Sequence, residues 1–296
     1  MPFIGELSAL AAALLWSFSS FLFTTASIRI GSIQLNISRM ILAALLLLIT
    51  ILAFNIDYDI TFQQFYLLSI SGFIGLVIGD TFLFKSFKEI GPRVSMLIMS
   101  SNPAIAAIMA YFVLSEVLSL WSILGIAITI SGISLVILDK RARAENKFPI
   151  TKMGVIYGLL GAAGQGIGLV FAKMAFVEGD VHSLVATFVR IAAAVIIMLP
   201  IAIIFKKYDN PFKLFANDKK ALGMVALGSI IGPYLGITFS FLAIIYVQIG
   251  IASTIMATTP IIMLPLSWII YKERLTARAI IGAIIAVFGV SLLFLL

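Results

Sequence analysis

The sequence contains no cysteine, and its only histidine is His182. The absence of cysteine excludes a disulfide framework and a thiolate metal site, and a single histidine excludes a multi-histidine metal cluster. The chain also lacks the GxxxxGKS or GxxxxGKT sequence of nucleotide-binding loops, which argues against direct use of ATP. We therefore expect a protein without a metal site or another cofactor.

Charged residues are scarce: they make up 11% of the 296 residues, whereas hydrophobic residues make up 62% and the mean hydropathy is +1.17. A water-soluble fold could not bury that much apolar surface. A helix needs roughly 20 apolar residues to cross a hydrocarbon core of about 30 Å, and such stretches follow one another almost end to end. The composition predicts an all-α polytopic membrane protein whose solvent is the lipid bilayer.

Apolar runs separated by polar breaks predict ten transmembrane helices. In the first half they cover residues 5–25, 33–54, 65–85, 92–114 and 119–138, and in the second half 152–173, 183–205, 221–243, 249–271 and 277–295. The stretch 139–151 between them is too charged to enter lipid. We therefore divide the chain into residues 1–148 and 149–296. Residues 1–16 lack the basic segment of a cleavable signal peptide, so we expect the first span to remain as a helix.

The two halves resemble each other, because residues 103–135 match residues 260–292 at a constant offset of 157. The matched pairs include Pro103 and Pro260, Glu116 and Glu273, Gly125 and Gly282, and Gly132 and Gly289. The same offset aligns Gly75, Gly79 and Thr81 with Gly232, Gly236 and Thr238, and at a slightly smaller offset Arg39 matches Arg190. Each half has five predicted helices, an odd number, so the halves enter the membrane in opposite directions. This pattern predicts two inverted five-helix repeats, an architecture typical of secondary transporters.

The loops after the first, third, fifth, seventh and ninth predicted helices carry nearly all of the Lys and Arg residues and leave only Lys173 and Arg190 on the opposite face. The positive-inside rule makes these loops cytoplasmic and places both termini outside, in a multi-pass protein of the cell (inner) membrane. The net charge of +7 is explained by this orientation, so we expect no nucleic-acid partner.

Several short motifs of the chain are those of a known family. They are Leu15-Trp16-Ser17, Ser38-Arg39, Asn102-Pro103, Leu114-Ser115-Glu116, Gly125, Gly132, Thr259-Pro260, Glu273-Arg274-Leu275, Gly282 and Gly289. Over essentially its whole length the chain resembles the EamA-like family of the drug/metabolite transporter superfamily. The resemblance implies ten helices in two inverted halves around a central cavity, and the export of amino acids or other small metabolites. The chain departs from it at Gly164-Gln165-Gly166, which stands where the first half has the Trp16 region.

Proline near the middle of two predicted helices marks a candidate hinge. Pro103 and Pro260 each remove one backbone hydrogen bond, and in lipid the freed carbonyls must face protein or water. The polar neighbours of both prolines favour a cavity wall over a kink that only improves packing; they are Ser101, Asn102, Thr258 and Thr259.

Asp80 is a carboxylate inside a predicted membrane helix, where a charge is costly and therefore a functional candidate. It would bind a substrate ammonium group or exchange a proton, or else pair with Lys85 or Lys88. Phe84 lies one turn further on the same face and would contact an apolar part of the substrate.

Lys173 and Glu6 are two further candidates for charge recognition or coupling. Lys173 would attract a substrate carboxylate or extend to the membrane interface. Glu6 would couple transport to protons or simply stabilise a helix N-terminus. The remaining cavity candidates are polar, aromatic or polarizable side chains within the spans: Trp16, Ser17, Ser20, Tyr157, Gln165, Tyr234 and Met256.

These patterns predict a secondary transporter, not an enzyme, that exposes a midplane cavity alternately to the two sides of the membrane. The resemblance implies the export of amino acids or similar small amphipathic metabolites, and proton coupling is one option for the motive force. One alternative is a transporter of sugar conjugates or phosphorylated metabolites, which needs paired cations in the cavity. Another is a membrane-embedded lipid-modifying enzyme, which needs clustered carboxylates or a nucleophile with a base. The sequence leaves open the substrate, the direction of flux and the oligomeric state.

Overall fold

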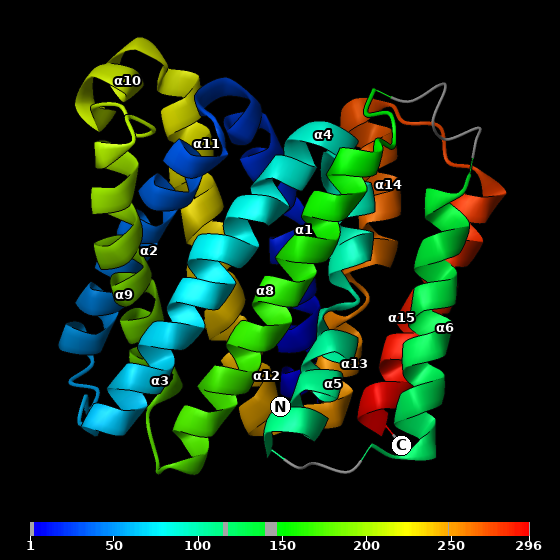
Figure 1. Ribbon diagram of the computed structural model, residues 1–296, viewed down its shortest axis with the longest axis horizontal. Helices are drawn as coiled ribbons and strands as arrows, with labels where there is room; N and C mark the ends of the chain where they lie inside the picture. Colours follow the sequence, from blue (N-terminus) through cyan, green and yellow to red (C-terminus); the bar gives the residue numbers. More distant parts are fainter. Residues whose placement is uncertain (1–2, 115–117, 140–146, 248, 296) are drawn as a thin grey trace.

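The computed structural model describes residues 3–114, 118–139, 147–247 and 249–295, and every regular element within these ranges is a helix. The helices lie alongside one another (Figure 1). In chain order they are α1 (Ile4–Ile30), α2 (Ser32–Ala53), α3 (Phe62–Gly72), the π-helix η1 (Phe73–Gly79), α4 (Asp80–Met99), α5 (Asn102–Leu114), α6 (Leu120–Ile137), α8 (Lys152–Val177), α9 (Ser183–Ile204), α10 (Pro211–Asn217), α11 (Lys219–Ser229), the π-helix η2 (Ile230–Gly236), α12 (Ile237–Tyr246), α13 (Ile249–Met256), α14 (Thr259–Tyr271) and α15 (Ala277–Leu295).

The predicted all-helical, multi-pass class is confirmed over the described residues. By length and composition, eight helical runs within them are able to cross a membrane. Two further apolar helices, Asn102–Leu114 and Ala277–Leu293, are shorter. The number of ten spans therefore stays a prediction. Gly91 has a non-helical backbone and lies in the predicted gap between the third and fourth spans, where it separates the helical run that starts at Phe62 from a short helical segment that ends at Met99. The fourth predicted span, 92–114, is interrupted at Ser100 and Ser101 before α5 begins.

Side chains at the helix N-termini explain where several helices begin. The Thr61 hydroxyl accepts a hydrogen bond from the backbone N–H of Gln64, and the Gln64 side chain accepts one from the backbone N–H of Thr61, which forms a capping box. Thr151 caps α8, and Asn210 followed by Pro211 starts α10. These caps satisfy backbone donors that the helices themselves leave free.

The two π-helices occupy equivalent places in the two halves. The bounds of η1, Phe73–Gly79, and those of η2, Ile230–Gly236, differ by the offset of 157 that relates the repeated sequences. A π-helix is rare and frequently accompanies a functional site. The repeat therefore extends from sequence to an unusual backbone geometry.

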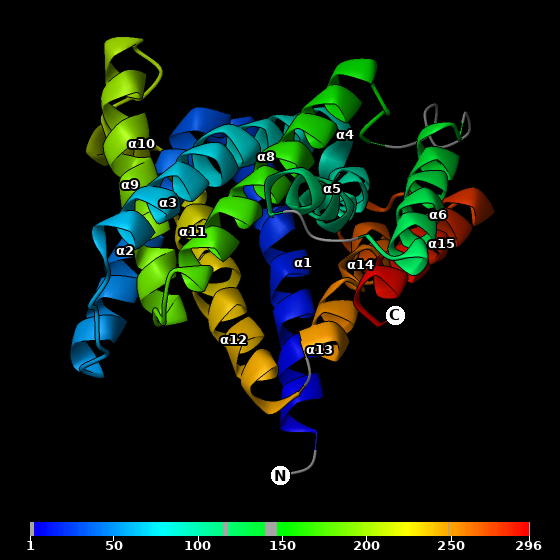
Figure 2. The same ribbon diagram turned by 60° about the horizontal axis from the view of Figure 1, so that its bottom comes forward.

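Equivalent helices of the two halves pack against each other in opposite directions. A Cβ atom built on Gly125 of α6 would lie 2.7 Å from the Gly289 carbonyl oxygen of α15, and one built on Gly132 would lie 2.6 Å from that of Gly282. As α6 advances, its contacts on α15 move backwards, so the two helices are antiparallel. Both views place this pair at one edge of the molecule, with α2 and α9 at the opposite edge (Figures 1 and 2).

The contact between α6 and α15 supports a first prediction. At Gly132 an added Cβ would also lie 2.4 Å from the backbone nitrogen of Ala286, so the helices must separate to accept it. We expect Gly132→Ala to lower the free energy of unfolding by about 1–3 kcal/mol, measured by thermal unfolding in detergent. The matched control is Gly223→Ala in α11, where a Cβ meets nothing within 4 Å. That change should be neutral or slightly stabilising because alanine favours a helix. Equal effects at the two positions would contradict the prediction.

Candidate binding cavity

A cavity of about 390 Å³ lies between the two halves of the molecule. Its lining comes from α1, α2, η1, α4 and α5 of the first half and from α8, α9, η2 and α12 of the second. The volume falls near the lower end of the range of small-molecule sites, about 300–1,000 Å³. Much of the wall is apolar and aromatic, and its aromatic and methionine side chains are Trp16, Phe23, Phe84, Phe87, Met40, Met96 and Met99. The cavity therefore suits a small ligand with an apolar part.

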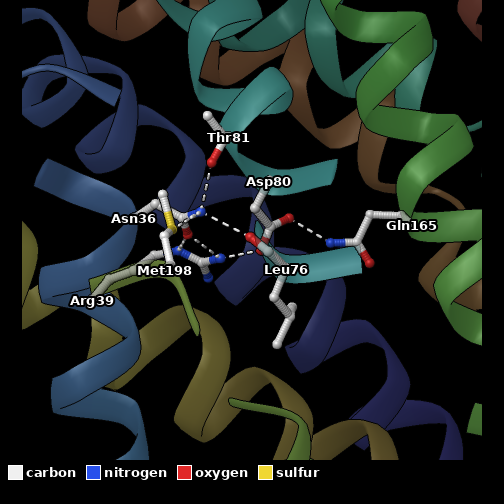
Figure 3. A network of polar contacts seen from close by, with 7 residues as sticks. All are labelled: Asn36, Arg39, Leu76, Asp80, Thr81, Gln165 and Met198. Carbon is white, nitrogen blue, oxygen red and sulfur yellow. Dashed lines mark hydrogen bonds and ion pairs between the residues drawn. The ribbon is translucent and has the colours of Figure 1, made fainter. Parts of the chain in front are cut away.

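A buried charge network lies on this wall (Figure 3). Asp80 is the first residue after η1, and one of its carboxylate oxygens forms an ion pair with Arg39 of α2. The other oxygen accepts a hydrogen bond from the side-chain amide of Gln165 on α8. Asp80 is 4% exposed and Arg39 is 8% exposed. The carboxylate of the first half is thus held by both halves of the molecule.

Asn36 connects the ion pair to η1. Its amide nitrogen donates to the Leu76 carbonyl oxygen at 2.8 Å and to the Thr81 hydroxyl at 3.0 Å. Its amide oxygen accepts from Arg39 Nε at 3.2 Å and from Nη2 at 3.0 Å. Arg39 also lies over the ring of Phe84, with its Cζ atom 4.8 Å from the ring centroid. These contacts leave Arg39 little freedom and orient its guanidinium towards Asp80.

Arg190 of α9 is the second arginine that lines the cavity. Its Nε is buried, and no described residue accepts a hydrogen bond from it. A Cβ built on Gly75 would lie 3.5 Å from Arg190 Nη2 and 3.7 Å from Gln165 Oε1, so the guanidinium lies beside the Asp80 network. The side-chain oxygen of Asn102, another lining residue, is also buried without a donor among the described residues. Two lining residues thus each have one buried polar atom without a hydrogen-bond partner among the described residues.

Two ion pairs join the halves, and both involve residues in or next to the basic loops. The helix α10, which belongs to one of these loops, lies at the top of Figure 1. Arg29, in the last turn of α1, pairs with Asp218 through two hydrogen bonds of 2.7 Å and 2.9 Å. Arg93 and Glu273 form a buried pair, with Nε 2.7 Å from Oε2. The hydrogen bond from the Arg29 side chain and that from the backbone N–H of Ala221 hold the pKa of Asp218 below its usual value, so it is ionised at neutral pH.

The structure brings six of the candidate residues from the sequence into the cavity wall: Trp16, Ser20, Asp80, Phe84, Asn102 and Gln165. Asp80 pairs with Arg39 in the preceding helix, whereas Lys85, one of its expected partners, lies over the rings of Phe82 and Tyr157.

Other candidate residues lie outside the described lining. Ser17, Ser101, Thr258 and Thr259 each donate a hydrogen bond to a backbone carbonyl of their own preceding turn. Tyr234 shares a 2.8 Å hydrogen bond with Thr50. Tyr157 stacks on Phe82, and Met256 packs against the cluster formed by Ala9, Ala243 and Ala252. Lys173 is exposed, and Glu6 is half-buried in the first turn of α1.

Pro103 and Pro260 mark helix breaks. Pro103 is the second residue of α5, which begins after an interruption at Ser100 and Ser101, and Pro260 is the second residue of α14. Proline fits the first turn of a helix because the N–H it lacks would have no partner there. Of the glutamates that recur in the repeat, Glu273 pairs with Arg93, and Glu116 lies outside the described residues.

The cavity residues predicted from the sequence did not include Arg39 or Arg190. Both are matching positions of the repeat, Arg39 also belongs to a family motif, and Arg190 is one of two basic residues away from the basic loops. Their location inside apolar runs was the available signal, because an arginine within a membrane span faces the protein interior and finds a partner there.

The chain resembles known proteins over nearly its full length. The model of the EamA-like transporter family matches twice, over residues 3–138 and 152–295. An uncharacterized transporter of Clostridium kluyveri is 26% identical over 143 residues, which are 48% of this chain and 45% of that protein. One solved crystal structure shares the fold, with a TM-score of 0.65 and 21% sequence identity over 97% of this chain and 95% of its own. The chain is therefore a multi-pass membrane protein that belongs to the EamA-like transporter family.

Proposed function

We propose that this protein is a secondary transporter that exports amino acids or similar small amphipathic metabolites by alternating access to the cavity. The observation that carries this proposal is a cavity of about 390 Å³ between the halves, with apolar and aromatic walls and a few charged groups. Such a wall fits a substrate with an apolar side chain and charged ends. Membership of a transporter family supports the same class of function.

Alternating access needs two halves that move relative to each other around a fixed site. The antiparallel packing of α6 with α15 and the matching positions of η1 and η2 support two inverted five-helix repeats, 1–148 and 149–296, and ten spans in all. The repeats would lie in the cell (inner) membrane with the basic loops in the cytoplasm and the termini outside. The ion pairs of Arg29 and Arg93 then hold the cytoplasmic side closed.

The motive force in this proposal is the substrate gradient or a proton. Asp80 is the carboxylate in the cavity wall and therefore the candidate for proton exchange or for binding a substrate ammonium group. Sugar conjugates and phosphorylated metabolites fit less well, because Asp80 already neutralises Arg39 and leaves one arginine for the ligand. A lipid-modifying enzyme would need clustered carboxylates, and Asp80 stands alone among the described lining residues.

A counterflow assay tests the proposal. The assay uses a panel of apolar, polar and charged amino acids. Proteoliposomes loaded with one unlabelled amino acid should accumulate the labelled form of that amino acid from outside, for at least one member of the panel. Ala43→Trp should abolish this exchange, because Ala43 lines the cavity and is 1% exposed. The matched control, Leu45→Trp, introduces the same ring on the exposed face of α2 and should exchange normally. Failure of the whole panel, or normal exchange by Ala43→Trp, would refute the proposal.

A further inference from the structure

The charged residues of the cavity wall occupy positions that recur in the two halves of the chain. Asp80 follows η1 directly, and Ile237 follows η2 directly, at the offset of 157 that relates the halves. Arg39 on α2 corresponds to Arg190 on α9, and these two helices pack together. All four residues line the cavity. The wall therefore carries both arginines, the carboxylate of Asp80, and the position that is equivalent to Asp80 in the second half.

The charge pair is complete in the first half alone. Arg39 has Asp80 as its counter-charge, whereas the position equivalent to Asp80 in the second half is the apolar Ile237. Both carboxylate oxygens of Asp80 are already engaged, one by Arg39 and the other by Gln165. Arg190 has no hydrogen-bond acceptor for its Nε among the described residues. Asp80 is near enough to attract Arg190, but both of its oxygens are engaged elsewhere. A buried guanidinium without an anion of its own is unfavourable, so the site is suited to an anion supplied from outside the chain.

We propose that Arg190 binds a carboxylate group of the substrate, which takes the role that Asp80 has in the first half. This inference rests on the proposed transport function and narrows its substrates to carboxylates. A guanidinium and a carboxylate form two parallel, charge-assisted hydrogen bonds, which are among the strongest in proteins. The cavity wall carries two guanidinium groups and one carboxylate among the described residues, so one guanidinium is left to pair with a carboxylate of the substrate.

The other lining residues indicate which groups the substrate carries besides its carboxylate. The buried side-chain oxygen of Asn102 accepts a hydrogen bond from an N–H or O–H group. Beyond these polar groups, Met96, Met99 and Phe84 present apolar and polarizable surface. A small monocarboxylate with one hydrogen-bond donor and an apolar tail satisfies each of these groups. A phosphate dianion would exceed the one positive charge that is left.

Paired acids and amides test this inference. The probes are 4-methylpentanoate with 4-methylpentanamide, L-leucine with L-leucinamide, and L-phenylalanine with L-phenylalaninamide. Binding to the purified protein is measured by the rise in its unfolding temperature, since a ligand stabilises the state that it binds. We expect each amide to bind about tenfold to hundredfold more weakly than its acid, because a hydrogen bond to a charged group is lost. Equal binding of acids and amides, or no binding of any acid, would overturn the inference.

A substitution at Ile237 gives a second, sharper test. Ile237→Asp places a carboxylate at the position equivalent to Asp80, so it should pair with Arg190, raise the unfolding temperature without ligand and abolish the preference for acids. The control is Ile237→Asn, whose side chain has the size of aspartate but no charge, and it should keep the preference for acids. An acid preference that survives in Ile237→Asp would overturn the inference.

Arg190→Lys and Arg190→Gln cover the case in which Ile237→Asp fails to fold. The lysine variant should retain a preference for acids, and the glutamine variant should lose it. An acid preference that persists in Arg190→Gln would also overturn the inference. Counterflow of amides as fast as acids would refute the carboxylate site and leave transport standing, whereas the absence of any counterflow would refute transport itself.

Discussion

Asp80→Asn is expected to lower the free energy of unfolding by about 3–5 kcal/mol, because it leaves the buried guanidinium of Arg39 without its counter-charge. The asparagine side chain keeps the size of the aspartate, so the effect reports the charge. The measurement is thermal or denaturant unfolding in detergent. The same change should stop counterflow, because Asp80 joins α2 to Gln165 on the other half and lines the cavity.

A double variant separates the two effects of the Asp80 substitution. Arg39→Leu combined with Asp80→Leu removes both charges, so it should recover most of the stability that Asp80→Asn loses, since no unpaired charge stays buried. Transport should remain lost if the carboxylate itself takes part. An Asp80→Asn protein as stable as the wild type would contradict the ion pair, and normal counterflow by this variant would remove Asp80 from the transport cycle.

A cross-link between residues 29 and 218 is expected to reduce counterflow to the level of empty liposomes. Arg29 and Asp218 join the two halves next to the basic loops, where the halves must separate for the cavity to open on that side. The chain has no cysteine, so Arg29→Cys with Asp218→Cys provides the only two thiols for a bifunctional thiol reagent with a reducible link. A reductant that cleaves the link should restore transport.

The controls for this experiment come from the same pair. Each single-cysteine variant treated with the reagent should transport normally, because this ion pair is exposed and screened by solvent, so its loss alone costs little stability. Counterflow that continues in the cross-linked double variant would show that this end of the molecule does not open, and would refute alternating access as proposed.

Hydrophobic runs predicted the helix bounds closely where polar residues end a span. The predicted ranges 33–54 and 183–205 correspond to Ser32–Ala53 and Ser183–Ile204. The first helix, predicted to end at residue 25, continues to Ile30. Its polar residues do not stop it, because Thr24 donates to the Ser20 carbonyl oxygen and Ser27 to that of Phe84. A hydroxyl that finds a backbone acceptor is compatible with a helix interior.

The candidate site was predictable where a residue is unusual for its environment. Asp80 and Gln165 stand out because polar side chains are costly within a membrane helix. Small hydroxyl residues were a weaker guide: Ser101, Thr258 and Thr259 satisfy themselves on their own helices. For a serine or threonine, the sequence does not reveal whether the hydroxyl bonds its own backbone or faces a cavity.

The sequence by itself determined that the chain spans a membrane as helices and that it contains a duplicated unit, because hydrophobic length and repeated residues are properties of the linear chain. Only the tertiary structure decided which charges meet. Arg39 pairs with Asp80 41 positions away, and Gln165 reaches the same carboxylate from 85 positions away. In the second half, the position equivalent to Asp80 holds the apolar Ile237, so that half supplies no carboxylate there for Arg190. The electrostatics of the cavity depend on distances between helices, and packing alone sets those distances.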